Sequence, residues 1–144
     1  MSRKKLILDL EEEVNETRLF GLNSSSTHLD LVHALNKSPL FHFNRKDDLE
    51  IVEKDIKNYF IAFESKNVAD ENHCLLVKTK GLNGYLSNEL KIFDYIFAFT
   101  CSTESFQEEL FKFLFNHKHI QLIRVLDIDE LKEKVKNLLT IESE

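Results

Sequence analysis

The run Tyr95–Cys101 (YIFAFTC) is the feature that most restricts how this chain can fold. Its residues are nearly all apolar, and most of them are the aromatic or β-branched types that favour strands. A strand with one face in water would alternate apolar and polar side chains, which this run does not do. The run therefore predicts a central strand that is buried on both faces, and the rest of the chain must cover both.

The residues just before this run predict a turn followed by a short capped segment. Asn83-Gly84 favours a tight type I′ hairpin, because both residues tolerate a positive φ. The hydroxyl of Ser87 can then cap a helical turn that begins at Asn88. Glu89 would lie in the first turn, where the helix dipole favours a carboxylate.

A resemblance to a known family rests on this region. Glu89, three further residues and then Phe93-Asp94-Tyr95 resemble the signature of the IPExxxVDY family of small bacterial proteins. Segments 4–9, 45–51 and 84–86 also match that family in order and length. The resemblance therefore covers most of the chain.

This copy departs from the family signature at three positions. Ser87-Asn88 stands where the family has Ile-Pro, and Phe93 stands where it has Val. The family is of unknown function, so the resemblance implies no catalytic residue. It singles out Glu89, Asp94 and Tyr95, which either fix the backbone and packing or bind a substrate; we expect the structural role.

Capping patterns predict where the helices begin. Thr27 with Asp30, Ser105 with Glu108 and Asp127 with Glu130 each place a capping side chain three residues before an acidic one. Apolar runs between them predict the strands. The expected strands are residues 6–9, 19–22, 40–43, 49–52, 59–63, 73–78, 95–101 and 120–126.

These elements predict the fold class. Strands near residues 19–22 and 96–101 are each followed by a Ser/Thr-rich helix start and a returning strand, which gives two βαβ-like units. Between them, residues 49–78 predict a β-meander. We expect a single α+β domain over residues 1–144, with a mixed, mostly antiparallel sheet and helices mainly on one face. The ends, 1–5 and 140–144, are expected to be flexible.

Composition excludes several kinds of partner. The net charge of −6 argues against nucleic acid, whose binding depends on Lys and Arg. No stretch approaches the roughly 20 apolar residues of a membrane-spanning helix. Leu6–Leu8 is too short for a signal-peptide core, so we expect a cytoplasmic protein. Cys74 and Cys101 fit reduced thiols in strands.

No constellation of residues indicates catalysis, a metal or a cofactor. His117-x-His119 is the nearest approach to a metal pair, but zinc needs a further ligand that the sequence does not nominate. A polar helix-to-strand turn explains the same residues. The chain has only three glycines, and they do not form a phosphate-binding loop. We therefore expect a protein that is not an enzyme.

The helix expected at residues 105–116 is apolar around much of its surface. Four residues, Phe106, Leu110, Phe113 and Leu114, form the stripe that faces a core. Phe111 and Phe115 widen the apolar arc to roughly 200°, which one sheet cannot cover. Either the terminal helix packs over these two side chains, or a second chain does.

The function that follows is a non-catalytic cytoplasmic binding or scaffolding protein. It would act through contact with a protein partner or as a homodimer, with Phe111 and Phe115 at the interface. The alternative is a regulatory domain that senses a small molecule. That molecule would bind at a helix N-terminus, at Ser24–Thr27 or Ser102–Ser105.

Overall fold

The computed structural model describes residues 17–67, 72–100 and 104–141 of the chain. The expected strand at 6–9, the Ser102 helix start and Cys101 lie outside these residues. In chain order the elements are β1 (Thr17–Asn23), α2 (His28–Leu35), β2 (Asn44–Glu53), β3 (Ile56–Asn67), β4 (Asn72–Lys78), β5 (Lys80–Gly81), β6 (Gly84–Tyr85), β7 (Tyr95–Thr100), α3 (Glu104–Phe115), β8 (Leu122–Leu126), the 3-10 helix η1 (Ile128–Glu130) and α4 (Glu133–Leu139).

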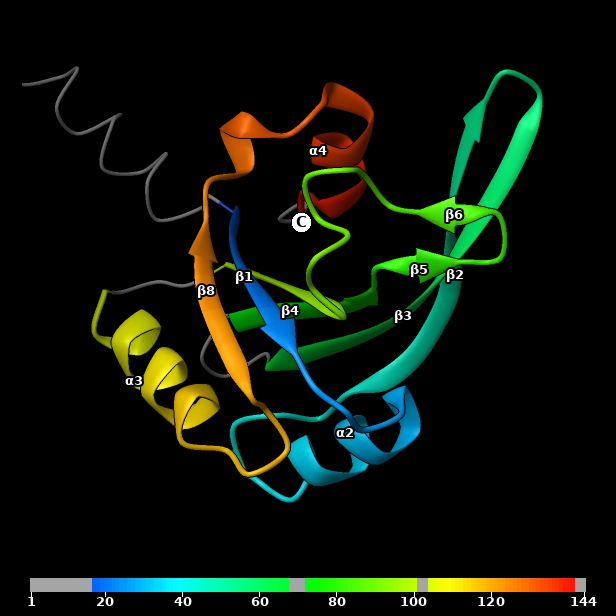
Figure 1. The fold of residues 1–144 in the computed structure, drawn as a ribbon. Coiled ribbons are helices and arrows are strands. Elements are labelled where there is room, and N and C mark those ends of the chain that lie inside the picture. The colour runs from blue at the N-terminus through cyan, green and yellow to red at the C-terminus, as the bar shows by residue number, and fades with distance from the viewer. Residues whose placement is uncertain (1–16, 68–71, 101–103, 142–144) are drawn as a thin grey trace, which may run out of the picture.

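In the described ranges, six strands form one sheet in the order β2-β3-β4-β7-β1-β8 (Figure 1). Every neighbouring pair in it is antiparallel. The short strands β5 and β6 form a separate hairpin. The expected α+β class with a mostly antiparallel sheet is confirmed.

The order of the strands shows how the predicted units are built. Strands β2, β3 and β4 are consecutive neighbours, as a meander requires. Strands β7 and β8 are both antiparallel to β1, so they run parallel to each other with β1 between them. The unit β7-α3-β8 is thus a split βαβ unit. The strands joined by α2, β1 and β2, lie still farther apart, with three strands between them.

Strand β7 lies inside the sheet and is covered on both faces. Tyr95 through Phe99 are all buried, which confirms the reading of the apolar run as a central strand. On one face, Phe97 and Phe99 belong to a core that α2 and α3 cover. Six of its buried residues are phenylalanines, and Phe20 packs edge-on against Phe111 of α3 with ring centroids 5.5 Å apart.

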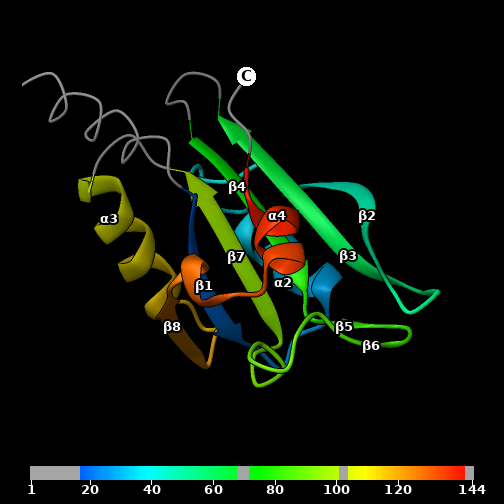
Figure 2. The same cartoon turned by 90° about the horizontal axis from the view of Figure 1, so that it is seen from above.

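The opposite face of β7 is covered by α4 and by the segment between β6 and β7. Ile96 and Ala98 pack there with Val135 and Leu139 of α4 and with Phe93. Figure 2 shows α4 and α3 on different sides of the sheet, with α3 at the β1–β8 end. Of the two alternatives for covering Phe111 and Phe115, the terminal helix is therefore wrong, because the apolar stripe of α4 packs on the other face.

Two hairpins differ from the turn chemistry that the sequence suggested. The β5-β6 hairpin forms, but Leu82 and Asn83 are its central residues, and only Gly84 has a positive φ (126°). The two-residue turn between β2 and β3 has the left-handed backbone of a type I′ hairpin, at Lys54 and Asp55 (φ 51° and 65°). Neither residue is a glycine or an asparagine, so the local sequence did not signal it.

Residues 40–43 were expected to form a strand, and this prediction is wrong. Phe41 and Phe43 are buried, but they precede β2 and pair with no strand. The side chain of Asn36, just after α2, accepts a hydrogen bond from the Phe43 N–H at 2.7 Å and donates one to its carbonyl at 2.9 Å. One amide thus satisfies the backbone groups that a neighbouring strand would otherwise bond.

The end of the chain also differs from expectation. Asp127 caps only the short helix η1, and α4 begins later, at Glu133. Residues 140 and 141 were expected in a flexible end, yet the Ile141 side chain is buried. The N–H of Ile141 donates a 2.9 Å hydrogen bond to Thr17 Oγ1. No helix in residues 17–67, 72–100 and 104–141 is long and apolar enough to cross a membrane.

Candidate functional site

Asp94 and Tyr95, two of the residues on which the resemblance rests, hold the connection between β1 and α2. The Asp94 carboxylate accepts a hydrogen bond from the Ser24 N–H at 2.9 Å. The backbone N–H of Asp94 donates to the Leu22 carbonyl, also at 2.9 Å. The Tyr95 hydroxyl donates to the Ser26 carbonyl, also at 2.9 Å. Both residues thus bond to backbone groups.

The surroundings of Tyr95 hold its hydroxyl in the protonated form. Burial, with the Asp94 carboxylate beside it, raises the pKa of Tyr95 to about 12. A phenol with such a pKa stays a hydrogen-bond donor at neutral pH. Glu89 is exposed, and among the described residues no hydrogen bond or ion pair joins its side chain to this pair. The three signature positions therefore do not converge on one site.

A second polar cluster joins this connection to the turn between α3 and β8. Ser26 Oγ lies 2.8 Å from Nδ1 of His119, and the Ser24 hydroxyl donates to the His119 carbonyl. Gln121 Oε1 accepts from the Ser25 N–H at 2.8 Å. A Ser–His contact can indicate a nucleophile. No carboxylate among the described residues bonds to the other ring nitrogen of His119, so the third group of such a device is lacking.

The same contacts occupy the backbone N–H groups with which Ser24–Thr27 could bind a small molecule. The N–H groups of Ser24, Ser25 and Ser26 bond to Asp94, Gln121 and Ser24 Oγ respectively. Thr27 caps α2 as expected, accepting from the Asp30 N–H at 3.2 Å. An anion at this helix start would therefore have to displace bonds that the chain already makes. The other suggested site, Ser102–Ser105, lies partly outside the described residues.

His117 and His119 form a polar turn between α3 and β8. Their rings lie 5.5 Å apart between centroids, and His117 Nδ1 accepts from the His119 N–H at 3.1 Å. Burial, followed by the nearby His119 and Lys118, lowers the pKa of His117 below its ordinary value. No group of three or more metal-ligating side chains occurs in the described parts of the chain.

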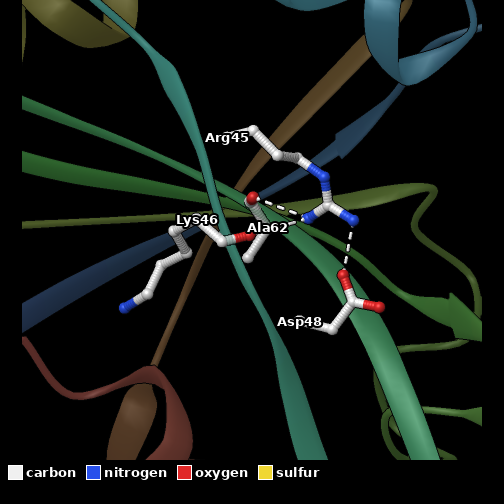
Figure 3. Close-up of polar contacts among 4 residues, drawn as sticks. All are labelled: Arg45, Lys46, Asp48 and Ala62. Atoms are coloured by element: carbon white, nitrogen blue, oxygen red, sulfur yellow. Dashed lines mark hydrogen bonds and ion pairs between the residues drawn. The ribbon is translucent and has the colours of Figure 1, made fainter.

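The two outer strands of the sheet, β2 and β8, differ sharply in character. Strand β2 (NRKDDLEIVE) is strongly charged, and its pairing with β3 is interrupted between Lys46 and Leu49. Arg45 lies across this irregularity, donating to the Ala62 carbonyl at 3.0 Å and to the Asp48 carboxylate (Figure 3). Charges and bulges of this kind prevent an edge strand from pairing with another chain.

Strand β8 (LIRVL) lacks such protection. Arg124 is its one charged residue, and among the described residues β8 pairs only with β1. Leu122 is 41% exposed and Val125 58% exposed. On α3, Phe115 is 63% exposed and stacks on Phe111 at 6.1 Å between ring centroids.

Val125 of β8 lies on the face of the sheet that α3 covers. Val125 is directly opposite Phe20 in the pairing of β8 with β1, and Phe20 packs against Phe111, which stacks on Phe115. We call the edge of β8 that is unpaired among the described residues, with Val125 and Phe115 on one face of the sheet and Leu122 on the other, the β8 edge surface. Of the two positions expected at an interface, Phe115 lies on this surface, whereas Phe111 is partly covered by its own chain.

A hollow next to the β8 edge surface extends it toward the start of β1. Its volume is about 330 Å³, and its lining includes Arg18, Gln107, Val125 and Asp127. Arg18 and Gln107 are hydrogen-bonded to each other there. The hollow sets polar and charged groups beside the apolar strand edge, a combination that is typical of protein interfaces.

Comparison with known proteins does not test the resemblance to the IPExxxVDY family, which stays a prediction. No model of a known protein family matches the chain. No curated protein matches it either.

Proposed function

We propose that this protein is a non-catalytic binding protein of the cytoplasm, and that it acts through protein–protein contact at the β8 edge surface. One observation carries the proposal: β8 is an apolar strand whose outer edge pairs with no other strand of the described residues, whereas β2 is charged and bulged. An open edge can bind an extended segment of another chain by forming further ladder hydrogen bonds. The exposed ring of Phe115 adds an apolar anchor next to that edge.

The roles of Asp94 and Tyr95 support a non-catalytic function. Both side chains bond to backbone groups of the β1–α2 connection, and Tyr95 is buried. A general acid or base would need to face a substrate. Membership of the IPExxxVDY family remains part of this proposal, with Asp94 and Tyr95 as structural positions of its signature.

Site-specific photocrosslinking in native cytoplasm tests the proposal. A photoreactive phenylalanine analogue is placed at Val125 and, as the matched control, at Val52, the exposed valine of the other outer strand. We expect a discrete protein adduct from position 125 and none from position 52. Equal adducts from both positions, or none from position 125, would refute a specific contact at β8.

A further inference from the structure

We infer that the partner at the β8 edge surface is a second copy of this chain, joined by antiparallel pairing of the two β8 strands. This inference rests on the function proposed above and names its partner. The pairing would continue the sheet from one copy into the other about a two-fold axis, so each copy would contribute the same surface.

The charges at the two ends of β8 complement each other in such a pairing. Lys118 precedes the strand by four residues, and Asp127 and Glu130 follow it; all three are exposed. In an antiparallel pair, the start of one strand lies beside the end of the other. Lys118 of each copy would therefore lie near the acidic end of the other copy. A chain with a net charge of −6 otherwise repels its own copies.

The apolar side chains add to the surface that the two copies bury, because the strand alone buries too little. β8 has five residues, and so short a ladder is far from the roughly 800 Å² per partner of a stable interface. Phe115 and Val125 lie on the same side of the sheet, linked through Phe20 and Phe111. The two-fold axis would bring this row of side chains against its counterpart in the other copy.

Light scattering during size-exclusion chromatography, from low to high micromolar concentration, tests the pairing. We expect the full-length protein to elute as a dimer at the upper concentrations. Val125→Lys should make it monomeric, because it places a charged side chain in the apolar row that each copy contributes to the contact. The control Val52→Lys, on the protected edge, should leave the dimer unchanged. Thermal unfolding of each variant confirms that it folds.

A charge reversal provides a second test with variants outside the strand. Lys118→Glu or Glu130→Lys alone should raise the dimer dissociation constant roughly three- to tenfold. The double variant should return it toward the wild-type value, because both pairs are restored with opposite sign. Single variants without effect, or a double variant weaker than both, would overturn the proposed orientation.

Other occupants of the surface give different results. A monomeric wild-type protein that still yields an adduct with another protein at position 125 would overturn the homodimer and leave the proposed function standing. A monomer in which the outward-facing β8 amides, those not bonded to β1, are protected from hydrogen exchange would show that the edge is already covered within one chain, and would overturn both. A dimer that survives Val125→Lys would also overturn the β8 pairing.

Discussion

The phenolic oxygen of Tyr95 lies 2.9 Å from the carbonyl oxygen of Ser26, although 69 positions separate the two residues in sequence. Asp94, the preceding residue, accepts from the N–H of Ser24 at the same distance. Two consecutive residues at the start of β7 thus hold both sides of the β1–α2 connection. This gives the Asp-Tyr pair a physical role that needs no ligand.

Tyr95→Phe should lower the free energy of unfolding by about 1–2 kcal/mol, because the Ser26 carbonyl loses its donor in a part-buried site. Urea denaturation followed by circular dichroism measures this change. Tyr85→Phe is the matched control, since Tyr85 is about half exposed. An equal loss in both variants would contradict a specific role for the Tyr95 hydroxyl.

The raised pKa of Tyr95 makes stability depend on pH above 10. The folded state favours the neutral phenol, with a pKa of about 12 against about 10 in the unfolded chain. Its contribution is therefore complete below pH 10 and is lost as the pH rises toward 12. We expect the difference in unfolding free energy between wild type and Tyr95→Phe to shrink over that range. A constant difference would show that Tyr95 is not the titrating group.

Asp94→Ala should destabilise the fold by about 1 kcal/mol or more, because the Ser24 N–H loses its acceptor. Glu89→Ala, at the other acidic position of the signature, should change stability by less than about 0.5 kcal/mol, since Glu89 is exposed. Chemical denaturation of the two variants side by side makes the comparison. A larger loss from Glu89→Ala would assign it contacts that the described residues do not provide.

Gly21→Ala should destabilise the protein by about 1–3 kcal/mol through overpacking. A methyl group at Gly21 would lie 2.7 Å from ring atoms of Phe93, a buried residue of the segment before β7. In a Phe93→Val background, with the residue that the family signature has there, the added cost of Gly21→Ala should be smaller. A double-mutant cycle measures this coupling, and strict additivity would disprove the packing argument.

Part of the fold could be read from local signals. The N-cap at Thr27, the apolar stripe of α2 and the buried run of β7 each depend on residues close together in sequence. Where a local pattern predicted the wrong structure, a contact with residues elsewhere in the chain decided the conformation instead. Residues 41–43 resemble a strand by alternation, but the amide of Asn36 bonds to Phe43 and no neighbouring strand is needed.

The candidate surface was predictable only in part. The wide apolar arc of α3 drew attention to Phe115, and the structure shows that this side chain is exposed. Nothing local distinguished β8 as an outer strand, since LIRVL suits an interior position equally well. Its contrast with the charged strand β2 becomes meaningful only once both are known to be the edges of one sheet.

The sequence by itself determined most of the segments that form strands and helices, and that β7 must be enclosed, because periodicity, capping and apolar content act over a few residues. The tertiary structure alone decided the strand order, the placing of α4 opposite α3 and the bonds from Asp94 and Tyr95 to the β1–α2 connection. Those features depend on pairings between residues tens of positions apart. Their free energy comes from the packing of the whole sheet, which no local pattern encodes.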